Sequence, residues 1–270
     1  MGAARGSDDR SRCMESSAVT ELRGPLPPAF YASRGRAGRS GWSDWWVVLH
    51  PPYTLWHLSY VGVGATLAPT FDGVRLTATM LAFFLAVGLG AHALDELHDR
   101  PLNTAIPAPA LVVVAVLSIS GAVALGVAGL DRVGPGLAVF IVVGAAVNCA
   151  YNLELFNGRL HNDVTFAVAW GAFPVLTAYY AQAETIGPAA LAAAAFAFWQ
   201  SAAQRALSTP ARNLRRRAES IEGAVTYADG RIEPLTRHDL LTPLETALKA
   251  MTWGTVALAA ALIWYRASHD

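Results

Sequence analysis

Charged residues are scarce in this chain of 270 residues, where they make up 15% of the sequence against 54% for hydrophobic residues. An average soluble domain carries about 25% charged residues. The 20 basic side chains are balanced by 20 acidic ones, so the chain has no net charge to hold a nucleic-acid backbone. This composition argues against an ordinary soluble domain and against a nucleic-acid partner.

Cysteine is scarcer still, with only two residues in the chain. Cys13 lies in a polar segment and Cys149 in an apolar one, and neither has a partner at the spacing of metal ligands. A disulfide-stabilised scaffold and a zinc module are therefore excluded.

Long stretches without charge follow one another along the chain, and a helix needs about 20 mostly apolar residues to cross a bilayer. These stretches lie between Asp44 and Asp72, Arg75 and Asp95, Arg100 and Asp131, Arg132 and Glu154, Asp163 and Glu184, Glu184 and Arg205, and Lys249 and Arg266. They predict an all-α, polytopic integral membrane bundle with about seven transmembrane helices in residues 41–270.

Basic residues are distributed unequally over the two sides of this predicted topology. All but Arg75, Arg132 and Arg266 fall on the side of the N-terminus, and cytoplasmic loops carry an excess of Lys and Arg. We therefore expect a cytoplasmic N-terminus, and a bacterial inner membrane as the location. Residues 1–40 are expected to form a disordered cytoplasmic tail, and residues 206–243 a long cytoplasmic loop.

An acidic segment follows the second apolar stretch. His92, Asp95, Glu96 and Asp99 have the i, i+3, i+4, i+7 spacing that places side chains on one helix face. Carboxylates held so close repel one another unless a cation lies between them, and oxygen ligands at a membrane edge suit Mg²⁺. The alternative is a solvated helix end whose charges face water.

A transition-metal site built from His92, Glu96 and His98 is disfavoured, because the two histidines lie on different sides of the helix. His50 and His57 lie seven residues apart in the first apolar stretch. We interpret each as a satisfied polar group near the membrane interface.

The segment from Asp95 to Asn103, followed by Ile106-Pro107, resembles the first aspartate-rich motif of the UbiA superfamily of intramembrane prenyltransferases. That motif is N-D-x-x-D-x-x-x-D, followed by a short basic stretch that ends in a proline. Asp95 stands at the Asn position, Glu96 and Asp99 at the first and second Asp positions, and Asn103 at the third. A polar loop that begins at Tyr151 and runs to Asp163 also agrees with the family.

The resemblance implies a helical bundle around a central cavity, where Mg²⁺ holds a polyprenyl diphosphate at the cytoplasmic mouth. The isoprenoid would be transferred to a lipophilic or small-molecule acceptor, or cyclised, with its tail in membrane lipid. The catalytic and metal-binding residues implied are Asp95, Glu96 and Asp99. The substrate-binding residues implied are Asn103, Tyr151, Arg159, Asn162, Gln200, Gln204, Arg212 and Arg215.

The sequence departs from the family at the end of the sixth apolar stretch, where a second aspartate-rich motif is usual. No acid is present there, but Gln200 and Gln204 keep an i, i+4 spacing, and Arg205, Arg212 and Arg215 can bind phosphate without metal. Nine spans are usual for the family, against about seven here. Alternatively, the arginines only set topology or bind anionic lipid headgroups.

One other function follows from these departures, and a further one is excluded by the sequence. A catalytically silent relative would bind or present an isoprenoid lipid, or act as an assembly partner. A CDP-alcohol transferase is excluded, because Asp72-Gly73-Val74-Arg75 lacks the neighbouring aspartates that such a metal site needs.

Overall fold

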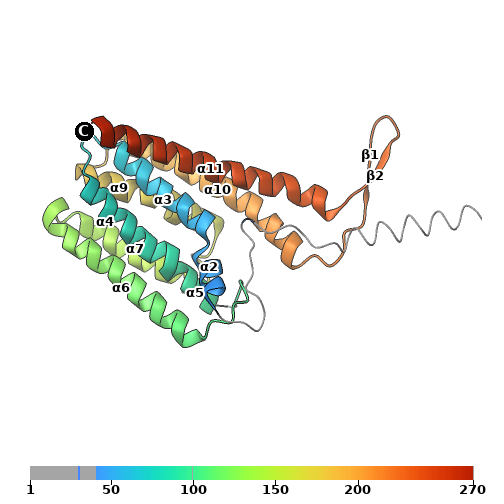
Figure 1. Ribbon diagram of the computed structural model, residues 1–270, viewed down its shortest axis with the longest axis horizontal. Coiled ribbons are helices and arrows are strands. Elements are labelled where there is room, and N and C mark those ends of the chain that lie inside the picture. The colour runs from blue at the N-terminus through green and yellow to red at the C-terminus, as the bar shows by residue number, and fades with distance from the viewer. Residues whose placement is uncertain (1–29, 31–40, 99, 270) are drawn as a thin grey trace, which may run out of the picture.

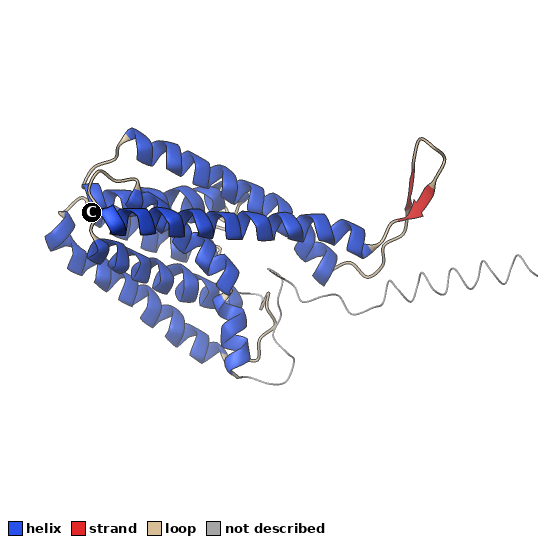
Figure 2. Ribbon diagram, turned by 45° about the horizontal axis from the view of Figure 1, so that its top comes forward, coloured by secondary structure: helices blue, strands red, loops and turns tan. Residues whose placement is uncertain are grey.

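The computed structural model describes residue 30, residues 41–98 and residues 100–269, and within these residues it is almost entirely helical (Figures 1 and 2). The all-α prediction is thus confirmed. The tail predicted for residues 1–40, apart from Phe30, and the metal ligand predicted at Asp99 lie outside the described residues.

The helices run back and forth between two ends of one bundle (Figure 1). In chain order they are α2 (Trp42–Leu49), α3 (Pro51–Thr66), α4 (Gly73–Phe83), the π-helix η1 (Phe84–Ala91), α5 (His92–Leu97), α6 (Ala108–Val133), α7 (Leu137–Asn152), α8 (Asp163–Ala167), the π-helix η2 (Val168–Ala172), α9 (Phe173–Ala183), α10 (Pro188–Arg216) and α11 (Arg237–His269).

Four helical segments within the described residues are long and apolar enough to cross a membrane. They are Gly73–Leu97, Ala108–Val133, Asp163–Ala183 and Arg237–His269. The chain is therefore consistent with an integral membrane protein. The remaining passes, α3, α7 and α10, are shorter or less apolar, so the number of seven spans stays a prediction.

The two ends of the bundle differ in their loops. The "basic end" carries α2, α5, the last turns of α10 and the first turns of α11, whereas the "opposite end" carries the C-terminus and three short connections (Figure 1). At the opposite end, Asp72 caps α4 by accepting hydrogen bonds from the backbone N–H groups of Val74 and Arg75. Capping of this kind satisfies donors that the first turn leaves free.

Two π-helical segments, η1 and η2, interrupt the second and fifth passes. Side-chain donors bind carbonyl groups in both segments: Asn148 Nδ2 donates to Ala86 O at 3.0 Å, and His57 Nδ1 lies 2.7 Å from Trp170 O. Such π-bulges are frequent at functional sites. Here they hold two helices in place on either side of the bundle interior.

Helix α3 occupies the centre of the bundle, between α9 and α11. Trp56 and Tyr60 on α3 are fully buried against Val175 and the small residues of α10. Gly64 is required where α3 meets α9, because any side chain at this position would collide with the carbonyl group of Val175. Close approach of this kind is typical of helix packing in membranes.

Helices α10 and α11 extend further than predicted. Both continue through an internal proline, Pro210 and Pro243, so the irregular segment is residues 217–236 instead of 206–243. This segment contains a small antiparallel hairpin of β1 (Ala224–Thr226) and β2 (Ile232–Pro234), which the sequence analysis did not predict. The hairpin stands at the tip of the two helices, clear of the bundle (Figures 1 and 2).

Candidate functional site

Glu96, predicted as a metal ligand, is fully buried and holds the loop after α5. Its Oε2 accepts the N–H of Leu102 at 2.9 Å, and its Oε1 accepts the N–H and the hydroxyl of Thr104 at 2.9 and 2.8 Å. Asp44 on α2 assists by accepting the N–H of Ala105 at 2.8 Å. Both oxygens of Glu96 are thus occupied by the protein itself.

Asp95, the neighbour of Glu96, has a different environment. It is half-buried, and its charge interacts with those of His161, Arg212 and Arg216. Because successive residues of a helix point about 100° apart, Asp95 faces the bundle interior while Glu96 faces the loop. The two carboxylates predicted to act together are therefore engaged with different partners.

Asp99, one of the three carboxylates expected to bind Mg²⁺, lies outside the described residues, so the three-carboxylate site stays a prediction. Among the described residues no group of three His, Cys, Asp or Glu side chains is arranged to hold a metal ion. Asn103, which was expected to contact the diphosphate, is exposed and lies at a loop position with a positive φ of 53°. Only Asp95 of the described motif residues points toward a candidate site.

A cluster of aromatic rings and histidines fills the interior next to Asp95, and we name it the aromatic–histidine cluster. Its members, Tyr53, His57, His92, Tyr151, His161, Phe166 and Trp170, come from α3, α5, α7, α8, η2 and the loop before α8.

The rings of this cluster form a continuous series of contacts. The ring of Tyr53 lies with its centroid 5.7 Å from His92, 4.3 Å from His57 and 6.3 Å from Phe166. Phe166 stacks on Trp170 at 5.8 Å, and Trp170 lies 4.4 Å from Tyr151. Aromatic faces attract cations, so such a lining suits a positively charged group or intermediate.

Two arginines of α10 border the cluster. Arg205 donates from Nε to Asp163 at 2.9 Å, and its guanidinium lies 5.1 Å from the centre of the Phe166 ring. Arg212 lies two turns further along, and its charge interacts with those of Arg205 and Asp95. Both arginines are partly buried, and a buried charge is costly unless it meets an opposite charge.

Tyr151 is the predicted substrate-binding residue that lies within the cluster. It is 5% exposed, its ring stacks on His161 at 4.4 Å, and its hydroxyl has no hydrogen-bond partner among the described residues. Two residues of the same loop have other positions. Asn162 caps α8 by accepting the N–H of Thr165 at 2.9 Å, and Arg159 is exposed.

The remaining predicted residues lie on α10 but have different partners. Arg215 forms a two-pronged ion pair with Glu245 of α11, which includes a 2.7 Å contact from Nη2 to Oε2. Gln204 is buried with its Oε1 unpaired within the described part of the chain, and Gln200 is half-buried. Of the three arginines in the predicted site, Arg159, Arg212 and Arg215, only Arg212 has a charge interaction with Asp95.

A large apolar groove lies beside the cluster. It has a volume of about 380 Å³, and it runs between α4, α6, α7 and the fifth pass. Trp170 lines the groove and also belongs to the aromatic–histidine cluster. An apolar chain in the groove would therefore end close to the polar side chains of the basic end.

Tyr53 was not predicted as a site residue, and His57 was interpreted as a satisfied polar group. His57 is 1% exposed and only its Nδ1 has a partner, whereas its Nε2 has none among the described residues. The sequence contains a signal for this face, because Tyr53, Trp56, His57 and Tyr60 follow the i, i+3, i+4, i+7 spacing.

Comparison with protein-family models finds no family that matches the chain. Comparisons with curated proteins and with solved structures find no match either. The resemblance to the UbiA superfamily thus depends on the quoted motif residues, and function has to be argued from the site.

Proposed function

We propose that the chain is a UbiA-like membrane prenyltransferase that binds a polyprenyl diphosphate at the basic end and transfers or cyclises its isoprenoid. The observation that carries the proposal is the pair of partly buried arginines, Arg205 and Arg212, beside Asp95 and the aromatic–histidine cluster. Guanidinium groups have planar donors that match phosphate oxygens in a two-pronged geometry.

In the proposed reaction the bond between C1 of the isoprenoid and the diphosphate oxygen breaks, and the electron pair leaves with the diphosphate. Arg205 and Arg212 offset the negative charge that develops on the leaving group. The allylic cation is stabilised by ring faces such as those of Tyr53 and Phe166. An acceptor then forms a bond to C1 and loses a proton, or the chain closes on itself and loses one.

The arginines of α10 take the position that a second acidic motif occupies in the family. Because Glu96 is engaged with Leu102 and Thr104, we derive no step through Mg²⁺. The apolar groove, which Trp170 joins to the cluster, is a suitable place for the isoprenoid tail.

The test is release of pyrophosphate by the purified protein, incubated with prenyl diphosphates of several chain lengths. Arg212→Gln should reduce the rate about tenfold to a hundredfold, since a hydrogen bond to a charged group contributes about 1.5–3 kcal/mol. Arg217→Gln is the matched control, because Arg217 is an exposed arginine at the same helix end. Equal losses in both variants would mean that only the overall charge matters.

A second candidate is a catalytically silent relative that binds or presents an isoprenoid lipid or acts as an assembly partner. The engagement of Glu96 with the loop favours it, because the first position of the acidic motif is then structural. This candidate predicts that a prenyl diphosphate binds in an Arg212-dependent manner without any release of pyrophosphate.

A further inference from the structure

The apolar groove also has a charged end, which lies away from the proposed diphosphate site. Its lining includes two charged residues, Arg75 and Arg132, and no acidic residue. Both arginines lie at the opposite end of the bundle, where α4 begins and α6 ends. The groove is thus apolar along its length and positively charged where it reaches that membrane surface.

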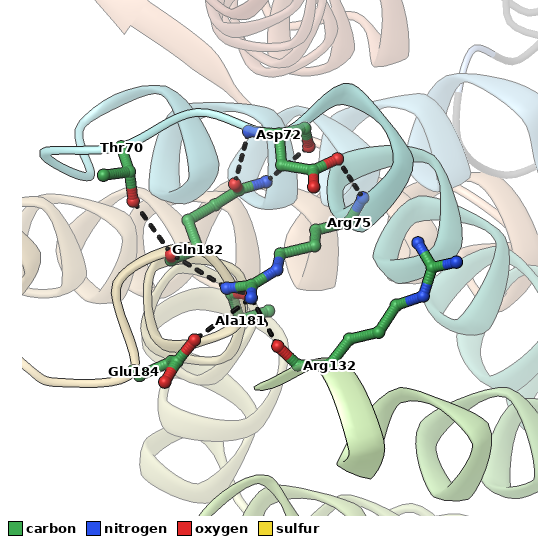
Figure 3. A network of polar contacts seen from close by, with 7 residues as sticks. All are labelled: Thr70, Asp72, Arg75, Arg132, Ala181, Gln182 and Glu184. Carbon is green, nitrogen blue, oxygen red and sulfur yellow. Dashed lines mark hydrogen bonds and ion pairs between the residues drawn. The ribbon is translucent and has the colours of Figure 1, made fainter. Parts of the chain in front are cut away.

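Arg75 forms the fixed wall of this end (Figure 3). Its Nη1 donates to the carbonyl groups of Ala181 and Gln182 at 3.1 Å each, and its Nη2 lies 3.0 Å from Glu184 Oε1. It also donates to the carbonyl group of Arg132. The charge of Arg75 is thereby neutralised, and both of its terminal nitrogens are occupied by the protein.

Arg132 differs from Arg75. Its side chain is exposed, and in Figure 3 its guanidinium points away from the network with no interaction drawn to it. Its charge interacts with that of Asp72, whose carboxylate already accepts hydrogen bonds from Val74 and Arg75. The guanidinium of Arg132 is therefore available to an anion at the mouth of the groove.

The depth of the groove indicates the length of its occupant. On α7, the lining extends from Leu137 to Asn148, which corresponds to about 17 Å at 1.5 Å per residue. Half of a bilayer's hydrocarbon core is about 15 Å thick. One acyl chain of a single leaflet matches this depth.

We propose that the groove holds an acyl chain of an anionic bilayer phospholipid, from the leaflet at the opposite end, whose phosphate binds Arg132. The charge of Arg132 and the depth of the groove favour such a lipid over a neutral one. This inference does not rest on the proposed prenyl transfer, because its polar contact lies at the other end of the bundle, although the two ligands would share the groove. A bound phospholipid would give way when an isoprenoid tail enters.

The experiment uses the full chain in nanodiscs of phosphatidylcholine with a minor fraction of phosphatidylglycerol, followed by gentle release and native mass spectrometry of the protein with its retained lipid. The parent should retain phosphatidylglycerol in preference to phosphatidylcholine. Arg132→Gln should lower this preference about fivefold, as expected for one arginine near an anionic surface. Arg266→Gln is the control at the same end, since Arg266 does not line the groove.

A second variant tests the groove itself. Ala82→Phe places a ring in the lining between α4 and its neighbours and should reduce retention of both lipids, while the melting temperature shows whether the fold is kept. Equal retention by the parent and Arg132→Gln, or a preference for phosphatidylcholine, would overturn the proposal. Loss of pyrophosphate release in the other assay, with lipid retention intact, would overturn only the prenyltransferase function.

Discussion

The two ends of the bundle differ in how fully their polar groups are hydrogen-bonded. At the opposite end, Arg75 binds Glu184 and two carbonyl groups, and Gln182 bonds Asp72 through both its Oε1 and its Nε2. At the basic end, buried polar atoms such as His57 Nε2 and the Tyr151 hydroxyl have no partner among the described residues. Since burying an unpaired polar group costs free energy, the second arrangement indicates a site for a ligand.

Glu96 is the exception within the basic end, and its removal should have the largest effect on stability. Glu96→Ala leaves the N–H groups of Leu102 and Thr104 without an acceptor in a buried loop. We expect a loss of about 3 kcal/mol or more, measured by thermal or denaturant unfolding in detergent.

Asp95→Ala is the matched control, because Asp95 is half-buried and no hydrogen bond to its carboxylate is present among the described residues. It should change stability much less than Glu96→Ala. A Glu96→Ala variant as stable as the parent, with Mg²⁺ binding lost, would show that Glu96 is a metal ligand after all.

The network of the opposite end should give the next largest effect. In Arg75→Gln the new side chain is too short to reach both Glu184 and the carbonyl groups of α9. The substitution should therefore lower the free energy of unfolding by about 2 kcal/mol. Arg132→Gln, whose side chain has no hydrogen bond within the described residues, should leave unfolding in lipid-free detergent unchanged. Equal melting temperatures for the two variants would contradict the structural role of Arg75.

His57 allows a comparison of its two ring nitrogens. His57→Asn keeps a donor near the position of Nδ1, which lies 2.7 Å from Trp170 O, whereas His57→Gln moves the donor toward the position of Nε2. The Asn variant should therefore be more stable by about 1 kcal/mol. The tryptophan fluorescence of each variant, measured with and without Trp170→Phe, reports whether η2 keeps its position. Equal stability of the Asn and Gln variants would contradict a stabilising hydrogen bond at Nδ1.

The smallest effect concerns the cap of α4. Hydrogen bonding from the backbone N–H of Arg75 holds the pKa of Asp72 below its ordinary value. A lowered pKa in the folded state means that Asp72 stabilises the fold at neutral pH, and that this contribution is lost as the pH falls below about 4. Asparagine still accepts a hydrogen bond but does not titrate. Asp72→Asn should therefore weaken the dependence of the free energy of unfolding on pH below about 4, and should change its value at neutral pH by no more than about 1 kcal/mol. An unchanged acid profile would assign the pH dependence to other carboxyl groups.

The apolar stretches predicted the helical bundle well, because uncharged length is a direct requirement of the bilayer. The acidic motif was harder to predict. The i, i+3, i+4, i+7 spacing predicted that Asp95 and Glu96 share one acidic face, but the loop from Leu102 to Thr104 folds back over Glu96 and donates hydrogen bonds to its carboxylate. A tertiary contact of this kind leaves no periodic signal in the sequence.

Other features of the site depend on distant segments in the same way. The π-helical segments η1 and η2 each contain an extra residue, which a search for a 3.6-residue period does not detect. A carbonyl group of η1 accepts a hydrogen bond from Asn148 of α7, and one of η2 lies within hydrogen-bond distance of His57 of α3. Helices α10 and α11 continue past Pro210 and Pro243, where sequence rules predict an interruption. Their mutual packing and the Arg215–Glu245 pair hold the extended turns together.

The projection formed by α10, α11 and the hairpin also has a practical consequence for imaging. A protein of 28.6 kDa embedded in a micelle offers little shape for aligning single particles. The turn at Ala228-Asp229-Gly230 lies at the tip of two continuous helices that are joined by a buried ion pair. A folded domain inserted at this turn would extend the particle beyond the micelle. It would thus provide an asymmetric feature that defines the orientation of each particle.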